Sequence, residues 1–137
     1  MQARVSLSEL GAAVILQAAE WVTPVLRLFM NDVVADPEEE LAYFTAPTFT
    51  GSAAVAIAAP AVPDPIAGGG LLFPMAPKLF TASAAPAEPE TAYGFVIYDT
   101  GDANRIIAAG RLPVPVTITA IGDQVYVDPE LRVQQTF

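Results

Sequence analysis

The sequence contains no cysteine and no histidine among its 137 residues. Their absence excludes thiol nucleophiles, disulfide bonds, histidine general bases and metal sites built on cysteine or histidine. Basic residues are also scarce: six stand against fifteen acidic residues, and the formal net charge is −9. Because phosphate groups repel a chain of this charge, we expect no direct binding to nucleic acid or to an anionic membrane.

Long uninterrupted apolar runs are missing as well. The longest apolar region, residues 53–72, is broken by prolines, an aspartate and three glycines, whereas a membrane-spanning helix needs about 20 mostly apolar residues. Hydrophobic residues nevertheless make up 53% of the chain, and many of them are alanine. Either burial against partner chains or an alanine-rich composition inherited from a GC-rich genome explains this excess.

The pattern that organises the chain spans residues 92–120. Side chains alternate between two faces from Tyr93 to Tyr98, the residues Asp99–Asp102 favour a tight turn, and the chain returns from Arg105 to Leu112. A third strand is predicted from Pro113 to Ala120, after a proline break, with its start at a sheet edge. We expect this hairpin to be the central pairing of an all-β domain.

Further short strands surround this hairpin, with turn signals between them. Pro24–Met30 has no clean alternation, so we expect both of its faces to be covered. The other candidates are Pro47–Ala59, Leu71–Phe73, Lys78–Ser83, Val125–Val127 and Leu131–Thr136. Six to eight short strands of this kind predict a mainly β, antiparallel fold, either a sandwich or a small barrel.

Two helices are predicted before and within this β domain. Ser6 and Glu9 fit a capping box, and apolar residues at three- and four-residue steps predict an amphipathic helix from Ser6 to about Ala19. A short second helix is predicted from Asp36, with Pro37 at its first position. The chain therefore divides into an N-terminal helical arm, residues 1–23, and a β domain, residues 24–137.

Two groups of acidic residues are candidate cation sites. Glu38–Glu40 could bind a cation, but a solvated helix start accounts for them better. Asp99, Asp102 and Asn104, with Asp123 and Asp128, could hold calcium, but their spacing lacks the pattern of a known calcium loop and fits plain turns. We therefore expect no catalytic residue, no metal and no cofactor, and predict that the protein is not an enzyme.

Four short segments resemble small structural proteins encoded in the virion gene clusters of tailed bacteriophages. They are Leu26–Asp32, Leu41–Thr45, Thr48–Gly51 and Ala92–Asp99, and the order along the chain also matches. The sequence departs from the family pattern where Tyr43 replaces an acid and Ser52 a tyrosine, and in the loop Pro60–Gly70. Such proteins carry no catalytic residues to transfer.

The resemblance implies a virion component with an antiparallel, jelly-roll-like β-sandwich that decorates or cements a capsid. A tail or head–tail adaptor role is the nearest rival. A free β-sandwich binding module, such as one that binds carbohydrate, is the alternative outside the virion.

The expected partners are identical subunits, in a homotrimer, and the major capsid protein or another virion protein. Attachment is predicted through the loop Pro60–Gly70, where Ala61, Val62 and Ile66 could bury apolar contacts. Leu10 on the N-terminal helix and Trp21 at its exit are further candidate contact residues. A loop that merely projects from the surface remains the alternative.

Overall fold

The computed structural model describes residues 2–4, 21–58, 64–65 and 71–134. It is mainly β with antiparallel sheets, as the sequence predicted. The strands are β1 (Gln2–Arg4), β2 (Pro24–Phe29), β3 (Val55–Ala56), β4 (Asp64–Pro65), β5 (Leu71–Pro74), β6 (Lys78–Thr81), β7 (Glu90–Asp99), β8 (Arg105–Ile118), β9 (Gln124–Val127) and β10 (Glu130–Gln134). The predicted helix from Ser6 to Ala19 lies outside the described residues.

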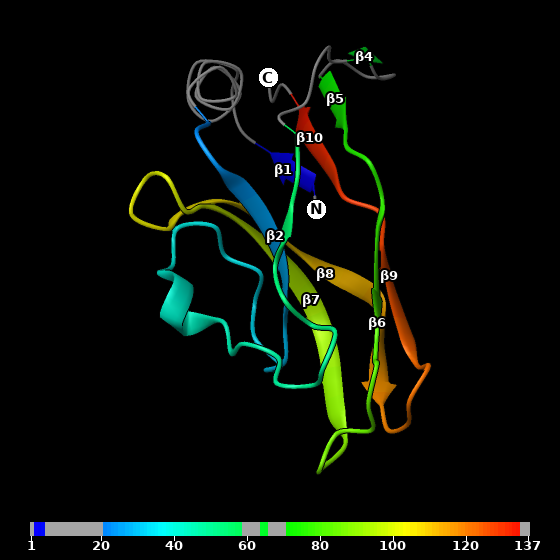
Figure 1. Cartoon of the computed structure of the whole chain (residues 1–137). Helices are drawn as coiled ribbons and strands as arrows, with labels where there is room; N and C mark the ends of the chain where they lie inside the picture. Colours follow the sequence, from blue (N-terminus) through cyan, green and yellow to red (C-terminus); the bar gives the residue numbers. More distant parts are fainter. Residues whose placement is uncertain (1, 5–20, 59–63, 66–70, 135–137) are drawn as a thin grey trace.

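The central sheet has the strand order β3-β2-β7-β8, and each neighbouring pair is antiparallel (Figure 1). β7 and β8 are the predicted hairpin, and their turn follows Asp99. β2 pairs with the other side of β7, with Leu26 opposite Ile97 and Leu28 opposite Phe95. The predicted hairpin is thus present and has the longest register in this sheet, but the prediction that it is the central pairing is wrong, because the middle pair in the strand order is β2 with β7.

The predicted break after Leu112 is wrong, because β8 continues through Pro113 and Pro115. Arg111 is opposite Gly94 and Val116 is opposite Ala92, so residues 112–115 of β8 face a single residue of β7. This bulge interrupts the ladder where both prolines lack an N–H donor. The predicted edge position is confirmed, since β8 is the last strand of its sheet.

Two further sheets accompany the central sheet. β6 pairs with β9 antiparallel, and Figure 1 shows this ribbon running beside the central sheet. The second has the order β1-β10-β5-β4, in which β1 is parallel to β10. Residues 2–4, which belong to the N-terminal segment expected to form a helical arm, are thus a strand of this sheet.

The core has two parts, one on each face of the central sheet. Leu26, Leu28 and Ile97 pack with Phe80 and Val125 of the β6–β9 ribbon. The opposite face belongs to a second cluster, whose buried members are Phe29, Phe44, Val96, Tyr98 and Ala109. Burying each large side chain of this kind stabilises the fold by about 1.5–3 kcal/mol. The prediction that both faces of β2 are covered is confirmed.

The segment after β2 returns across the second face without forming the predicted helix. Asp36 accepts a hydrogen bond from the Glu38 N–H at 2.9 Å, which closes a turn, and the helical part is one 3-10 turn, Leu41–Tyr43. Phe44 then leaves in an extended conformation, and its ring packs 5.0 Å from that of Phe29. Aspartate therefore initiates a turn here, but burial of Phe44 ends the helical conformation after three residues.

Candidate functional site

The acidic turn at the end of β7 is a structural junction. The Asp99 side chain is fully buried, and its carboxylate accepts hydrogen bonds from the N–H groups of Val22 and Thr23 at 2.8 Å and of Gly101 at 3.0 Å. The bonds from Val22 and Thr23 are the main reason that the pKa of Asp99 lies below its ordinary value. The Asp99 carboxylate therefore holds the two residues that precede β2 against the β7–β8 turn.

The neighbouring residues of this turn do not converge with Asp99 on one point. Asp102 forms an ion pair with Arg105 at 2.7 Å. Asn104 has a positive φ of 58°, as does Ala103 with 50°, and both residues are exposed. Within the described parts of the chain, no group of three or more acidic, histidine or cysteine side chains is placed to hold a metal ion.

Asp123 plays a comparable part in the turn between β8 and β9. Its Oδ2 accepts hydrogen bonds from the N–H of Thr119 at 2.8 Å and of Ala120 at 3.0 Å. These two bonds are the main reason that the pKa of Asp123 is lowered. The carboxylate thus closes its own turn, whereas Asp128 is exposed beyond the end of β9.

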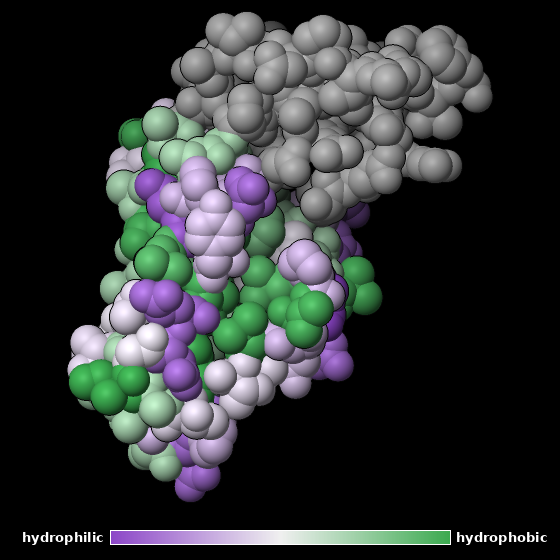
Figure 2. Space-filling model, turned by 90° about the vertical axis from the view of Figure 1, so that its right-hand side faces the viewer, coloured by the Kyte–Doolittle hydropathy of each residue, from purple (hydrophilic) through white to green (hydrophobic). Residues whose placement is uncertain are grey.

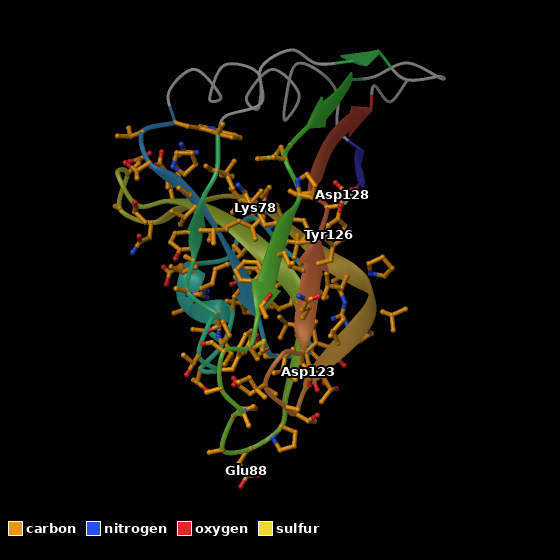
Figure 3. All side chains as sticks on the ribbon, turned by 45° about the vertical axis from the view of Figure 1, so that its right-hand side comes forward. Lys78, Glu88, Asp123, Tyr126 and Asp128 are labelled. Carbon is orange, nitrogen blue, oxygen red and sulfur yellow. The ribbon has the colours of Figure 1, made fainter. Side chains whose placement is uncertain are left out.

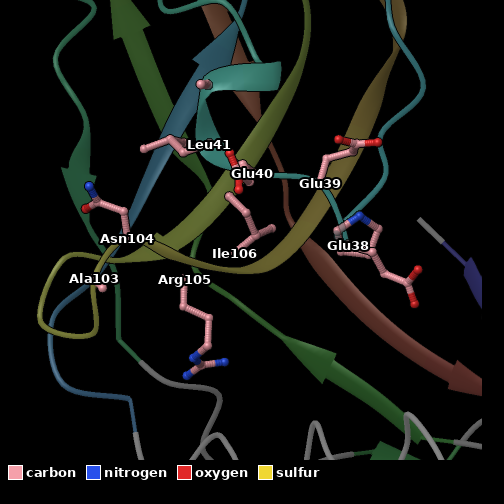
Figure 4. Close-up of a pocket in the computed structure, with 10 residues that line it drawn as sticks. Glu38, Glu39, Glu40, Leu41, Ala103, Asn104, Arg105 and Ile106 are labelled. Carbon is pink, nitrogen blue, oxygen red and sulfur yellow. The ribbon is translucent and has the colours of Figure 1, made fainter.

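A shallow groove of about 510 Å³ lies between Glu38–Glu40 and the β7–β8 turn (Figure 4). All three glutamates are exposed, and neither ion pair formed by the described residues includes them. Figure 4 shows that the Glu38, Glu39 and Glu40 carboxylates point in different directions. Chelation needs oxygens that converge within about 2.3–2.6 Å of one ion, so this groove is not arranged as a cation site.

The outward face of the β6–β9 ribbon carries the exposed apolar pair of this region. Leu79 is directly opposite Tyr126, and these side chains are 53% and 59% exposed. The next outward pair is polar: Gln124 donates a hydrogen bond of 3.4 Å to the Thr81 hydroxyl. Figure 2 shows that hydrophobic groups gather across the middle of this side of the molecule, among hydrophilic ones. Such a surface is suited to contact with another macromolecule.

The predicted contact residues Leu10, Ala61, Val62 and Ile66 lie outside the described residues, so their role stays a prediction. Trp21 is half-buried and packs against the larger core cluster. Its indole N–H is buried and has no hydrogen-bond acceptor among the described residues. Trp21 directly precedes the two residues bound by Asp99.

Sequence reasoning missed the pair formed by Leu79 and Tyr126. The signal was present, because Leu79 and Tyr126 alternate with Phe80, Val125 and Val127 along two predicted strands. Alternation places Leu79 and Tyr126 on the face opposite to the core, but only the pairing of β6 with β9 brings them together.

No family model, no curated protein and no solved structure matches this chain. In the described residues, no helix has the length and apolar character that a membrane span requires.

Proposed function

We propose that this protein is a non-enzymatic structural component of a tailed-bacteriophage virion, which decorates or cements the capsid through protein–protein contacts. The observation that carries this proposal is the exposed apolar pair Leu79 and Tyr126 on the β6–β9 ribbon. A cross-strand pair brings the two side chains within about 4.5–5.5 Å of each other at Cβ. They therefore offer one continuous apolar surface rather than two scattered contacts.

The segments that resemble phage structural proteins give additional support. Leu26–Asp32 contains most of β2, Leu41–Thr45 contains the 3-10 turn, and Ala92–Asp99 contains most of β7. Residues of all three segments meet in the second core cluster, which includes Phe29, Phe44 and Val96. A pattern shared through core residues fits a common scaffold with no catalytic centre.

We further propose that the layers form an antiparallel, jelly-roll-like β-sandwich and that the protein assembles as a homotrimer. Packing of Phe80 and Val125 from the β6–β9 ribbon against Leu26 and Ile97 supports a two-layer arrangement. Exposed apolar residues outside the ribbon, Val114 and Ile121 among them, offer surface for contacts between subunits.

Exposure of Tyr126 also favours a second candidate, a free β-sandwich binding module. An exposed aromatic ring with polar neighbours such as Thr81 and Gln124 is typical of surfaces that stack on carbohydrate rings. Tail or head–tail adaptor proteins would use the same apolar surface on a different part of the virion. Electron microscopy of the particle distinguishes these roles.

The test is to purify particles of the phage that encodes this chain and to locate the protein in them. We expect mass spectrometry to find it in many copies per particle and electron microscopy to place it on the capsid. Density at the tail or neck would support the adaptor role. Absence from the particle, together with binding of the isolated protein to soluble glycans, would overturn the structural role in favour of the binding module.

A further inference from the structure

The surface around Leu79 and Tyr126 has a border of acidic side chains. Asp128 follows Tyr126 by two residues and is exposed, and Asp123 precedes Gln124 and is half-exposed. Figure 3 shows Asp128 and Asp123 on either side of Tyr126 along β9, with Glu88 on the loop beyond Asp123. The border therefore consists of three carboxylate residues, one beyond one end of the apolar pair and two beyond the other end.

Positive charge is scarce among the described side chains of this surface. Lys78, the chain's single lysine, adjoins Leu79 and is only half-exposed. Glu88 and Asp128 are exposed, while Asp123 keeps a negative charge although the N–H groups of Thr119 and Ala120 donate to it. With a formal net charge of −9 for the whole chain, the border attracts cations and repels anions.

We propose that the β6–β9 face is the attachment surface of this protein, and that it docks on a protein surface with apolar side chains bordered by Lys or Arg. The assignment of that partner to a virion rests on the proposed function, whereas the position and charge of the surface do not. Apolar contact at Leu79 and Tyr126 holds the complex together. The acidic border selects the partner and increases the rate of association.

Charge decides between the possible occupants of this face. A second copy of the chain would bring one acidic border against another, and like charges in an interface oppose binding. Nucleic acid and anionic lipid are repelled for the same reason. A basic protein surface is the occupant for which both the apolar centre and the border are favourable.

The first experiment measures binding of the full chain to particles that lack it. The double variant Leu79→Ser with Tyr126→Ser should bind about 30-fold more weakly, as expected for a central apolar contact. Val34→Ser is the matched control, because Val34 is 73% exposed and lies in the segment that covers the opposite face of the central sheet. Circular dichroism verifies that each variant is folded.

A second pair of variants tests the charge of the border. Glu88→Lys with Asp128→Lys should lower the association rate about tenfold and weaken its dependence on salt. Glu38→Lys with Glu39→Lys is the matched control, since these exposed glutamates lie in the groove beside the β7–β8 turn. Equal loss in both pairs would overturn the acidic border as the selecting feature.

A third measurement does not depend on particles. Two synthetic peptides, one alternating Leu with Lys and one alternating Leu with Glu, are titrated into the labelled protein and followed by NMR. We expect the Leu–Lys peptide alone to shift the amide signals of β6 and β9.

The outcomes separate the two proposals. If wild-type protein binds no particle but the Leu–Lys peptide binds at β6–β9, the virion role fails and the surface assignment stands. The surface assignment is overturned if particle binding survives the Leu79/Tyr126 double variant, if the peptide shifts other residues, or if the double variant abolishes self-association, which would make the face a contact between copies.

Discussion

In two turns of this protein an aspartate carboxylate accepts hydrogen bonds from backbone N–H groups, but the donors lie at very different distances along the sequence. Asp123 accepts hydrogen bonds from Thr119 and Ala120, four and three residues before it. Asp99 accepts bonds from Val22 and Thr23, which precede it by 77 and 76 residues. The first carboxylate organises a local turn, whereas the second connects the beginning of the central sheet to its hairpin.

The two aspartates also differ in how deeply their side chains are buried. Asp99 is fully buried, while Asp123 is half-exposed. Water can replace a lost hydrogen bond at an exposed turn, but it reaches the partly buried donors of Val22, Thr23 and Gly101 less readily. The same residue type is therefore a small local contribution in one turn and a tertiary connection in the other.

The largest effect should come from removing the buried carboxylate. Asp99→Ala leaves three backbone N–H groups without their acceptor, so we expect the unfolding midpoint in urea to fall about twice as far as in Asp123→Ala. Circular dichroism reports global unfolding, and the fluorescence of Trp21, the chain's single tryptophan, reports the junction. If the two variants lowered the unfolding midpoint equally, neither the burial of the aspartate nor its sequence distance from the donors would determine its contribution to stability.

How far the sequence predicts this protein depends on the same distinction between local and distant contacts. Turn residues and alternation predicted the β7–β8 hairpin and the turn at Asp123. They did not predict that Asp99 binds Val22 and Thr23, because no local pattern records a contact across 76 residues. The Leu79–Tyr126 pair was missed for the same reason, since it depends on the pairing of β6 with β9.

Predictions from local sequence patterns also failed where tertiary contacts determine the conformation. Pro113 and Pro115 predicted a strand break, but an edge position and a bulge allow β8 to continue. Asp36 predicted a helix, but the following residues are drawn into the second core cluster. Strand existence was thus predictable, whereas strand limits and surface pairs required the fold.

Acid should weaken the Asp99 junction more than the Asp123 turn. In the folded protein the pKa of both carboxyl groups is lowered from its ordinary value, chiefly by the backbone N–H groups that donate to them, while an unfolded Asp has a pKa of about 3.9. Their stabilisation is therefore fully present above the unfolded value and is lost as the pH falls through the folded values.

Urea unfolding between pH 7 and pH 2 measures this dependence. Wild-type stability should decline below about pH 4, and Asp99→Asn should flatten that decline more than Asp123→Asn, because Asp99 holds three backbone donors. A steeper acid limb in either variant would contradict the assigned sign of the pKa shifts.

The stability of alanine variants at a glycine in each turn, Gly101 and Gly122, provides a second comparison, with smaller expected effects. A Cβ at Gly101 would lie 2.6 Å from Cγ1 of Val22, so Gly101→Ala pushes against the residues that Asp99 binds. We expect a loss of about 1–3 kcal/mol. Gly122 has a φ of +90° and nothing within 4 Å, so Gly122→Ala should cost only the backbone strain, about 1–2 kcal/mol.

These glycine variants are distinguished by their position as well as their size. Gly101→Ala should change the fluorescence of Trp21 in the folded state, because Trp21 adjoins Val22. Gly122→Ala should leave it unchanged. A change of equal size in both would mean that the two turns are coupled.

The smallest effect is expected at the exposed carboxylate beside Asp99. Asp102 pairs with Arg105 at 2.7 Å, and the two side chains are 54% and 31% exposed. Exposed pairs contribute about 0–1 kcal/mol, because water and salt screen the charges. Asp102→Asn should therefore shift the unfolding midpoint very little and leave the Trp21 signal intact, although it alters the same turn as Asp99→Ala. If Asp102→Asn instead matched Asp99→Ala, the turn as a whole would stabilise the junction, and the buried carboxylate would have no special part in it.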